Sequence, residues 1–569
     1  MHTVKTDVLI IGSGGAGLRA AIELHKQHID VLVVGKCARR DAHTILATGG
    51  INAALKTMDK KDSWQLHAAD TLRDGGEINN PKAVELLCKH APRAVHELAS
   101  WGMKFHRETN RKITQRFFGA ATYRRACFAG DYTGKEILRV LVNQVMKRRI
   151  KFKSNMYIFS LLSSKGKVNG ALGFDIKTHS VIMFQAKVVV LATGGYSRMF
   201  QRSSSRFWEN NGDGIKLAGD VGATLMDMEM LQFHPTGMIF PKEAEGILVT
   251  EAVRGEGGIL TNVKGERFMH RYDKERMELS ARDIVARSIY LEVQAGRGTK
   301  RGGVFLDISH RPRQYILKRL PKIFWQFQKY AGIDISKQKM EVAPTAHYSM
   351  GGVFVNHTTG KTTVENLYAI GEVTAGVHGA NRLGGNSLAE IMVFGRLTAQ
   401  QIARDVRKVH SIPIDEKLVK KKNEEFERLK HSKGKNPIKV MKSIQQLMWK
   451  HCGVARNAHD MKKAVIQLEK YARIKFNCAN TMDLVAALNV QNIIFSSEMI
   501  LRSALLRKES RGAHYRTDYP RLSKTWRKNI LCVSSKSGYK LKTRHVAPIP
   551  KELKMFIKCQ KLPVHRLME

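Results

Sequence analysis

The chain has 569 residues, 43% of them hydrophobic, which is enough for roughly three or four domains with buried cores. Its formal net charge of +46 predicts anionic partners. Because no zinc-finger, aromatic RNA-binding or basic-zipper signature accompanies that charge, we expect an acidic protein or a membrane face, not a direct nucleic-acid role. The seven cysteines form no C-x-x-C pair, which argues against a disulfide framework, a metal site or an iron–sulfur cluster within this chain.

Residues 7–21, DVLIIGSGGAGLRAA, carry the first element of the chain. The apolar run 8–11 predicts a strand buried on both faces, and Gly12, Gly14 and Gly17 follow it at G-x-G-x-x-G spacing before a helical pattern. Glycines at this turn let a pyrophosphate approach the free N–H groups of the helix. With a second strand at 30–34, the pattern predicts a nucleotide-binding domain. Gly35 stands where a plain NAD site carries an acid, which argues against NAD.

The first apolar strand begins at residue 6 or 7, and the longest apolar runs are strand-sized, below the ~20 residues of a spanning helix. We therefore predict neither a signal peptide nor a transmembrane segment, and we expect the chain to stay in the compartment where it is made.

Further elements follow in order. A glycine loop with Arg39 and Arg40 at 36–55 can face phosphate, and residues 64–84 look helical. A buried strand with a glycine turn is predicted at 188–195, and Asp213 precedes a helix at 215–218, where it either caps the helix or reaches a ribose hydroxyl. Residues 246–283 look like an inserted domain.

The pattern predicts that the first domain resumes at 343–353 and closes with a strand that ends at Glu372 and with a helix after 379–390. Beyond residue 410 the chain is lysine-rich and helical, and 420–435 is interpreted as a solvated helix face and loop. The basic tail from Lys524 has weak periodicity.

Three of these pieces, GSGGAG, VVVLATGG and NLYAIGEV, resemble the FAD-binding fold. Together with AHT at 42–44, QFHPTG, TEAVRGEGG, ELSARD, AHYSMGG and GANRLGGNSL, residues 6–520 resemble the flavoprotein subunits of succinate dehydrogenase and fumarate reductase. L-Aspartate oxidase shares much of the set, but oxidase-type relatives lack the histidine found here at position 43.

The resemblance implies an α/β protein in which an FAD-binding Rossmann-like domain holds an inserted α+β capping domain and is followed by a helical and a small C-terminal domain. We place the FAD-binding domain at 1–235 and 343–410, the capping domain at 236–342, the helical domain at 411–523 and the basic C-terminal segment at 524–569.

The resemblance also implies FAD as cofactor, attached covalently through His43. Thr48 stands where the family often has Gln or Glu before the paired glycines, which leaves the preferred direction of the reaction open. The expected FAD contacts are Gly12, Ser13, Gly14, Gly15, Ala16, Gly17, Lys36, His43, Thr44, Gly49, Gly50, Asp213, Glu372, Ser387 and Leu388.

A four-carbon dicarboxylate needs cationic and hydrogen-bonding groups at each end. The resemblance assigns substrate binding to His234, Thr250, His347 and Arg382. It assigns the catalytic proton to Arg282, with Glu251 and Arg254 as a relay. Taken singly, each residue has a plainer interpretation: an Arg282–Asp283 pair, a helix cap at Glu251, and satisfied core histidines.

The leading hypothesis is an enzyme that interconverts succinate and fumarate. Because the chain has no cluster ligands, electrons must pass to a partner protein, to a soluble acceptor or to oxygen. In the respiratory relatives an iron–sulfur subunit docks on the flavoprotein and membrane anchor subunits bind quinone, so we expect those partners and a peripheral position on the cytoplasmic face of a prokaryotic inner membrane. The alternatives are an L-aspartate oxidase and a non-catalytic basic binding protein on a flavin scaffold.

Overall fold

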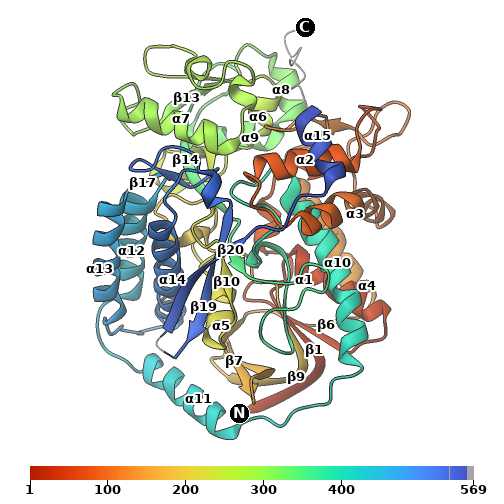
Figure 1. Cartoon of the computed structure of the whole chain (residues 1–569), viewed down its shortest axis with the longest axis vertical. Helices are drawn as coiled ribbons and strands as arrows, with labels where there is room; N and C mark the ends of the chain where they lie inside the picture. Colours follow the sequence, from red (N-terminus) through yellow and green to blue (C-terminus); the bar gives the residue numbers. More distant parts are fainter. Residues whose placement is uncertain (537, 560–569) are drawn as a thin grey trace.

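The computed structural model describes residues 1–536 and 538–559, so the last ten residues of the predicted C-terminal segment, 560–569, lie outside the described residues. The main sheet has the strand order β6-β2-β1-β9-β8-β7, with β16 beside β9 (Figure 1). Its strands are β1 (His2–Ile11), β2 (Val31–Val34), β6 (Lys151–Lys153), β7 (Met156–Ser164), β8 (Lys167–Asp175), β9 (Val181–Leu191) and β16 (Leu367–Ala369).

Strands β1, β9 and β16 run in parallel, so their carboxyl ends meet at one edge of the sheet. Ile11 pairs with Leu191, and Leu191 pairs with Ala369. The three sequence pieces GSGGAG, ATGG and IGEV each follow one of these residues. This edge is where open parallel sheets bind their ligands.

Strand β1 is buried on both faces, as its apolar run predicts. Val8 and Ile10 enter one core, which α1 (Gly15–Lys26) and α10 (Asn386–Val406) cover. Leu9 and Ile11 enter the opposite core, and all four side chains are at most 5% exposed. Burial of each contributes roughly 1.5–3 kcal/mol to folding, which fixes the turn after Ile11 in space.

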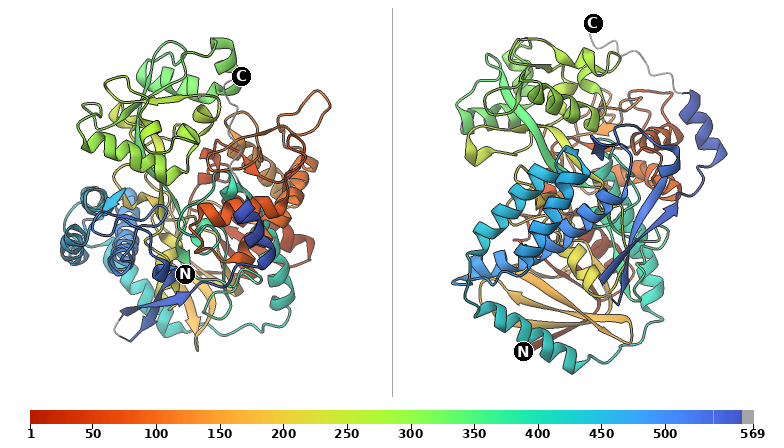
Figure 2. Two further views of the ribbon diagram at one scale, coloured as in Figure 1. Left: turned by 45° about the horizontal axis from the view of Figure 1, so that its top comes forward. Right: turned by 60° about the vertical axis from the view of Figure 1, so that its left-hand side comes forward.

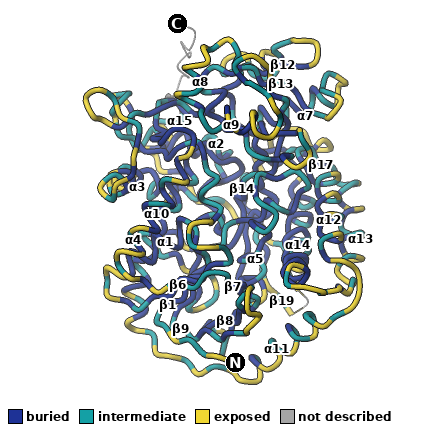
Figure 3. Tube along the Cα trace, turned by 180° about the vertical axis from the view of Figure 1, so that it is seen from behind, coloured by how far each residue is buried: buried dark blue, intermediate teal, exposed yellow. Residues whose placement is uncertain are grey.

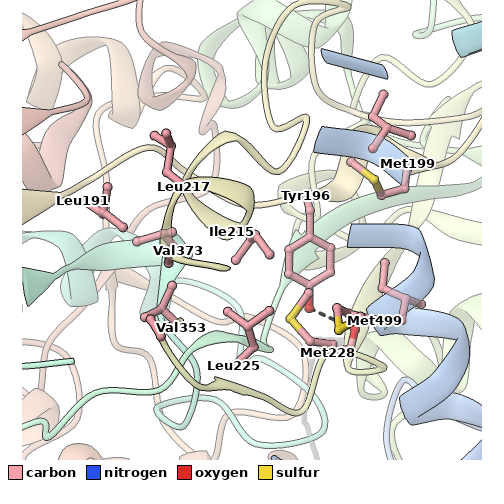
Figure 4. Close-up of a cluster of buried hydrophobic side chains, with 14 of the residues drawn as sticks. Leu191, Tyr196, Met199, Ile215, Leu217, Leu225, Met228, Val353, Val373 and Met499 are labelled. Carbon is pink, nitrogen blue, oxygen red and sulfur yellow. Dashed lines mark hydrogen bonds between the residues drawn. The ribbon is translucent and has the colours of Figure 1, made fainter. Parts of the chain in front are cut away.

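The second core joins the sheet to the C-terminal helices. Figure 4 shows Ile215 beside Tyr196, with Val373 and Leu191 farther along the same cluster. The Tyr196 hydroxyl donates to the Met228 carbonyl over 3.0 Å. Helix α5 (Asp213–Asp220) contributes Ile215 and α14 (Thr481–Leu506) contributes residues from the other side. Figure 3 shows this interior as a continuous buried region.

A second sheet, in the order β11-β14-β13-β12, carries residues 239–339, which we call the upper lobe (top of Figure 1). Its apolar core includes Phe268, Phe324 and Phe327. Within the lobe lie α6 (Ala252–Gly255), β12 (Ile259–Thr261), α7 (Arg282–Gln294), β13 (Val304–Asp307), α8 (Arg313–Arg319) and α9 (Pro321–Ala331). Strands β11 (Leu231–Met238) and β14 (Met340–Ser349) of the same sheet connect it to the rest of the chain.

The lysine-rich region forms helices beside the main sheet (Figure 2). They are α11 (Glu416–Lys430), α12 (Pro437–Cys452), α13 (Ala458–Ala472) and α14. Only Val419 and Phe426 of α11 are buried, in agreement with a solvated helix face. Within the described ranges α14 alone is long and apolar enough to cross a membrane, although no such segment is predicted above. Its most apolar window has a mean hydropathy of 1.4 and is 72% buried, as in the core helix of a globular domain.

The tail from Lys524 is more ordered than its weak periodicity indicates. Strands β19 (Lys528–Ser535) and β20 (Gly538–His545) form an antiparallel hairpin that extends a sheet with β10 (Leu225–Met226) and β15 (Gly352–Val353). Helix α15 (Lys551–Cys559) then lies against α2 (Trp64–Asp74).

Several predicted boundaries differ from the structure. Strand β1 begins at His2 instead of residue 6 or 7, and β9 begins at Val181 instead of residue 188. The helix predicted at 64–84 is two helices, because Asn80 caps a new helix, α3 (Pro81–Ser100), with Pro81 in its first turn. The second strand begins at Val31, and α5 begins at Asp213 instead of residue 215. Strand β16 ends at Ala369, so Glu372 lies in a 3-10 turn. The remaining elements are β3 (Ile51–Asn52), β4 (Gln115–Arg116), β5 (Ala126–Cys127), α4 (Thr133–Lys147), β17 (Ala455–Arg456) and β18 (Tyr515–Arg516).

Candidate active site

One cavity runs along the carboxyl edge of the main sheet and ends beneath the upper lobe. All of the predicted cofactor residues line this cavity except Gly17. All of the predicted substrate and catalytic residues line it except Arg254. Its wall therefore combines loops after β1 and β9 with side chains from β11, α7 and the start of α10.

The glycine turn is fixed by close backbone contacts. Gly12 has a φ of +119°, and a Cβ there would lie 2.1 Å from the Ala192 carbonyl oxygen. A Cβ on Gly17 would lie 2.0 Å from the Gly12 oxygen. Gly17 thus allows helix α1 to pack on the turn. The start of α1, Gly15 and Ala16, lines the cavity and has no acidic residue in its first turn, which suits an anion, although the Gly15 N–H donates to Thr44 Oγ1 over 3.0 Å.

At the far end of the cavity, the Lys36 ammonium lies 2.6 Å from Asp213 Oδ2, and Asn492 donates to the other oxygen over 3.0 Å. Asp213 makes no side-chain cap on α5, where Gly212 holds the cap position with a φ of +80°. Asp213 thus does not cap α5, and its contact with a ribose hydroxyl stays a prediction.

Two hydroxyl groups on the cavity wall fit a hydrogen-bonding cofactor. Thr48 lies just before Gly49, and Thr193 follows β9. Both side-chain oxygens are buried and have no hydrogen-bond partner among the described residues. Because buried hydroxyls are normally paired, these two atoms indicate that a polar ligand completes the site.

His43 begins a short 3-10 helix, His43–Leu46, halfway along the cavity. Its Nδ1 lies 3.1 Å from Glu209 Oε2. Burial lowers the pKa of His43, but the hydrogen bond and the charge of Glu209 outweigh that effect, so the net shift of the pKa is upward.

Under the upper lobe, Arg282 pairs with Glu251 and not with Asp283. Arg282 Nε lies 2.8 Å from Glu251 Oε2, and the other carboxylate oxygen accepts from the Gly119 N–H over 2.6 Å. Arg254 lies 3.9 Å from the same carboxylate. Burial raises the pKa of Glu251, but the two arginines outweigh burial and hold the pKa below its usual value. The predicted relay residues are thus in one buried row.

Gln232 connects Arg282 to Arg382, and this role of Gln232 was not predicted from the sequence. Its side-chain oxygen accepts from Arg282 Nη1 over 3.1 Å and from Arg382 Nη2 over 3.2 Å. A signal for it exists: in a strand, residues two apart share a face, so Gln232 and His234 point the same way.

The remaining predicted substrate residues face the same space. Burial and the Arg282 charge lower the pKa of Arg382 to about 10. The rings of His234 and His347 are 5.2 Å apart, and burial followed by the Arg282 charge lowers both of their pKa values, so both are neutral. A pocket with several guanidinium groups and neutral donors suits a small dianion.

Comparison with known proteins identifies the families that this chain matches. Residues 7–388 match the FAD binding domain family, and residues 441–556 match the family described as fumarate reductase flavoprotein C-term. The fold and this site define an FAD-dependent oxidoreductase, with FAD as its cofactor.

The matching relatives cover nearly the whole chain. It is 41% identical to a fumarate reductase (CoM/CoB) polypeptide of Methanothermobacter marburgensis, over 93% of this chain and 97% of that one. It is 36% identical to the succinate dehydrogenase flavoprotein subunit of Rickettsia bellii, over 94% of each chain. The chain belongs to the succinate dehydrogenase and fumarate reductase flavoprotein family.

Solved structures agree in fold. The Mycobacterium smegmatis Sdh1 structure in complex with UQ1 superposes with a TM-score of 0.86 at 38% identity, covering 97% of this chain and 96% of that one. A variant of FrdA from the E. coli quinol fumarate reductase gives a TM-score of 0.90 at 30% identity, covering 97% and 99%. The predicted fold class is confirmed.

Proposed function

We propose that this chain interconverts succinate and fumarate by hydride transfer to or from FAD, attached covalently through His43. The observation that carries the proposal is the buried row Glu251–Arg282–Gln232–Arg382, which closes one end of the cavity. When bound, FAD supplies the two-electron centre that accepts or donates the hydride.

Arg382 binds one carboxylate of the substrate, and His234, His347 and Thr250 hold the other. This clamp replaces a random encounter with one fixed geometry. In fumarate reduction Arg282 gives a proton to the substrate carbon, and Glu251 with Arg254 resupplies it; succinate oxidation reverses the path. We assign the FAD contacts to the full set of positions predicted from the sequence, including Ser13, Ala16 and Thr44, all of which line the cavity except Gly17.

The proposed domain boundaries follow the expected ones, with 236–342 as the capping domain. The apolar core of the upper lobe supports a unit that closes over substrate and excludes water. We also propose an iron–sulfur subunit and membrane anchor subunits as partners, with the chain peripheral to a membrane; its +46 charge suits an anionic docking face.

The first experiment measures dye-linked succinate oxidation and fumarate reduction by the purified chain, together with flavin in acid-denatured protein. The fumarate assay includes coenzymes M and B as donors, because one relative is named for them. We expect turnover in both directions and yellow, protein-bound flavin. Oxidation of L-aspartate with release of free flavin would favour the oxidase instead, and salt-sensitive lipid or nucleic-acid binding without turnover would favour a binding protein.

A further inference from the structure

The buried carboxylate of Glu209 contacts the His43 ring, and the reaction proposed above gives Glu209 no role. We propose that Glu209 is the positioning residue for flavin attachment: it orients the His43 ring and holds the proton on Nδ1, so that Nε2 is the atom that bonds FAD. This inference rests on the proposal that His43 carries the flavin. Glu209 and His43 are 166 residues apart in sequence, yet their side chains meet at 3.1 Å.

The carboxylate itself is firmly held. Glu209 is 7% exposed, and Arg206 Nε donates to its Oε2 over 2.8 Å. Arg206 also donates to the Asp41 carbonyl over 2.6 Å, two residues before His43, so one guanidinium ties the histidine loop to the glutamate segment. Burial raises the pKa of Glu209, but the bonds from Arg206 and His43 outweigh burial and lower the pKa to about 2. Glu209 is therefore ionised and can only accept a hydrogen bond.

An ionised acceptor at Nδ1 fixes the tautomer of a neutral imidazole. With the proton on Nδ1, the lone pair is on Nε2, which has no hydrogen-bond partner among the described residues. A carboxylate in this position also makes the other ring nitrogen more basic and stabilises the imidazolium as that nitrogen forms a bond. His43 lines the same cavity as Gly49 and Gly50, the cavity to which FAD is assigned above.

The attachment step balances as follows. His43 Nε2 forms a bond to the 8α carbon of the flavin, and that carbon loses one hydrogen as a proton. The two electrons of the broken C–H bond go to the flavin ring, and an acceptor, fumarate or dioxygen, removes them. The imidazole ring becomes cationic during the step, and the charge of Glu209 faces that cation directly.

The test compares the wild type with Glu209→Gln, Glu209→Asp and the control Asp220→Asn. The Gln variant keeps the shape but loses the charge, and the Asp variant keeps the charge one methylene farther from the ring. Asp220 is a partly exposed carboxylate on α5 that pairs with Lys216. Each chain is incubated with FAD and fumarate, and covalent flavin is measured against time by fluorescence of the denatured band, with total flavin measured on the native protein.

We expect attachment in Glu209→Gln to be at least ten-fold slower than in the wild type at equal total flavin, with Glu209→Asp in between and Asp220→Asn unchanged. Wild-type attachment in Glu209→Gln would overturn the inference. If that variant binds no flavin, Glu209→Asp decides: slower attachment at normal total flavin supports the inference, and an unchanged rate refutes it.

The outcomes separate this inference from the proposed function. If the wild type turns over dicarboxylate but holds no covalent flavin, both the covalent attachment and this inference are refuted, and the proposed reaction stands. Covalent flavin without dicarboxylate turnover removes the proposed reaction and leaves the role of Glu209. Normal attachment in Glu209→Gln beside normal wild-type turnover removes only the role of Glu209.

Discussion

Arginine is an unusual choice for proton transfer, because a free guanidinium holds its proton up to a pH above ~12. The surroundings of Arg282 address this difficulty. Arg382 lines the same cavity and Arg254 lies outside it beside Glu251, and burial together with repulsion from Arg282 lowers the pKa of both neighbours. Glu251, ionised and 2.8 Å away, offers a direct route for the replacement proton.

Replacing Arg282 with Lys or Ala should therefore remove catalysis without removing the cofactor. A general acid typically contributes 10²–10⁴-fold to rate, so we expect kcat for fumarate reduction to fall by about that factor. Arg287→Lys is the matched control, since Arg287 is on the same helix but lies over the Tyr515 ring, 5.1 Å from its centre. Near-normal turnover of the Arg282 variants, at normal flavin content, would refute the proton role.

The sequence order of motifs located Arg282, Glu251 and Arg382, because each sits in a short stretch whose neighbours mark it. Glu209 carries no such mark, and Gln232, although it lies in the QFHPTG stretch with His234, was given no role by that stretch. Their importance arises from contacts across long separations: Gln232 meets Arg382 150 residues away, and Glu209 meets His43 166 residues away. Contacts of this kind depend on the fold and cannot be inferred from spacing within one segment.

At the scale of elements, the carboxyl end of α2 meets the start of α7 through an acidic pair. Asn381 Nδ2 donates to Asp283 Oδ1 over 2.9 Å and to Asp74 Oδ1 over 3.2 Å. Burial and then the Asp283 charge raise the pKa of Asp74 to about 8, although Arg73, Arg276 and Arg282 pull it down. Asp74 thus favours its protonated form in the folded chain at neutral pH.

A carboxyl group whose pKa is higher folded than unfolded binds more protons in the folded state, so it favours folding at low pH and loses that effect as pH rises. The contribution of Asp74 should be full below about pH 4 and should be lost by about pH 8. We expect Asp74→Asn to gain stability relative to the wild type as pH rises across this window. Denaturant midpoints at several pH values measure this gain; a constant difference between Asp74→Asn and the wild type across the window would contradict the assignment.

Element prediction succeeded where a clear boundary marked the pattern, as at the carboxyl end of β1 and the start of α10, and failed where the pattern was short. In β20 the exposed residues Lys540 and Lys542 alternate with the partly buried Tyr539 and Leu541. This alternation covers too few residues to stand out in a basic tail. The break between α2 and α3 did carry a signal, the Asn80–Pro81 pair, which a helix-boundary rule detects.

At the scale of the whole molecule, buried carboxylates join the upper lobe to the rest of the chain. Besides the Glu251–Gly119 bond, the lobe is held by Asp131, which is fully buried. Its carboxylate accepts from the N–H groups of Lys322 and Ile323, over 3.1 and 3.0 Å, at the first turn of α9. A side chain from one part thus caps a helix of the other, where the helix dipole also favours a negative charge.

Loss of the Asp131 cap on α9 should weaken the contact between the upper lobe and the rest of the chain more than it destabilises the upper lobe itself. A helix cap contributes about 0.5–2 kcal/mol, so Asp131→Ala should raise KM for fumarate by about 2- to 30-fold and leave kcat nearly unchanged. The control is Asp334→Ala, whose carboxylate accepts from the Ser336 N–H over 2.9 Å within the lobe. Steady-state kinetics and limited proteolysis of both variants distinguish the cases. If Asp334→Ala raises KM as much as Asp131→Ala, or if neither does, the contact of Asp131 with α9 does not govern closure.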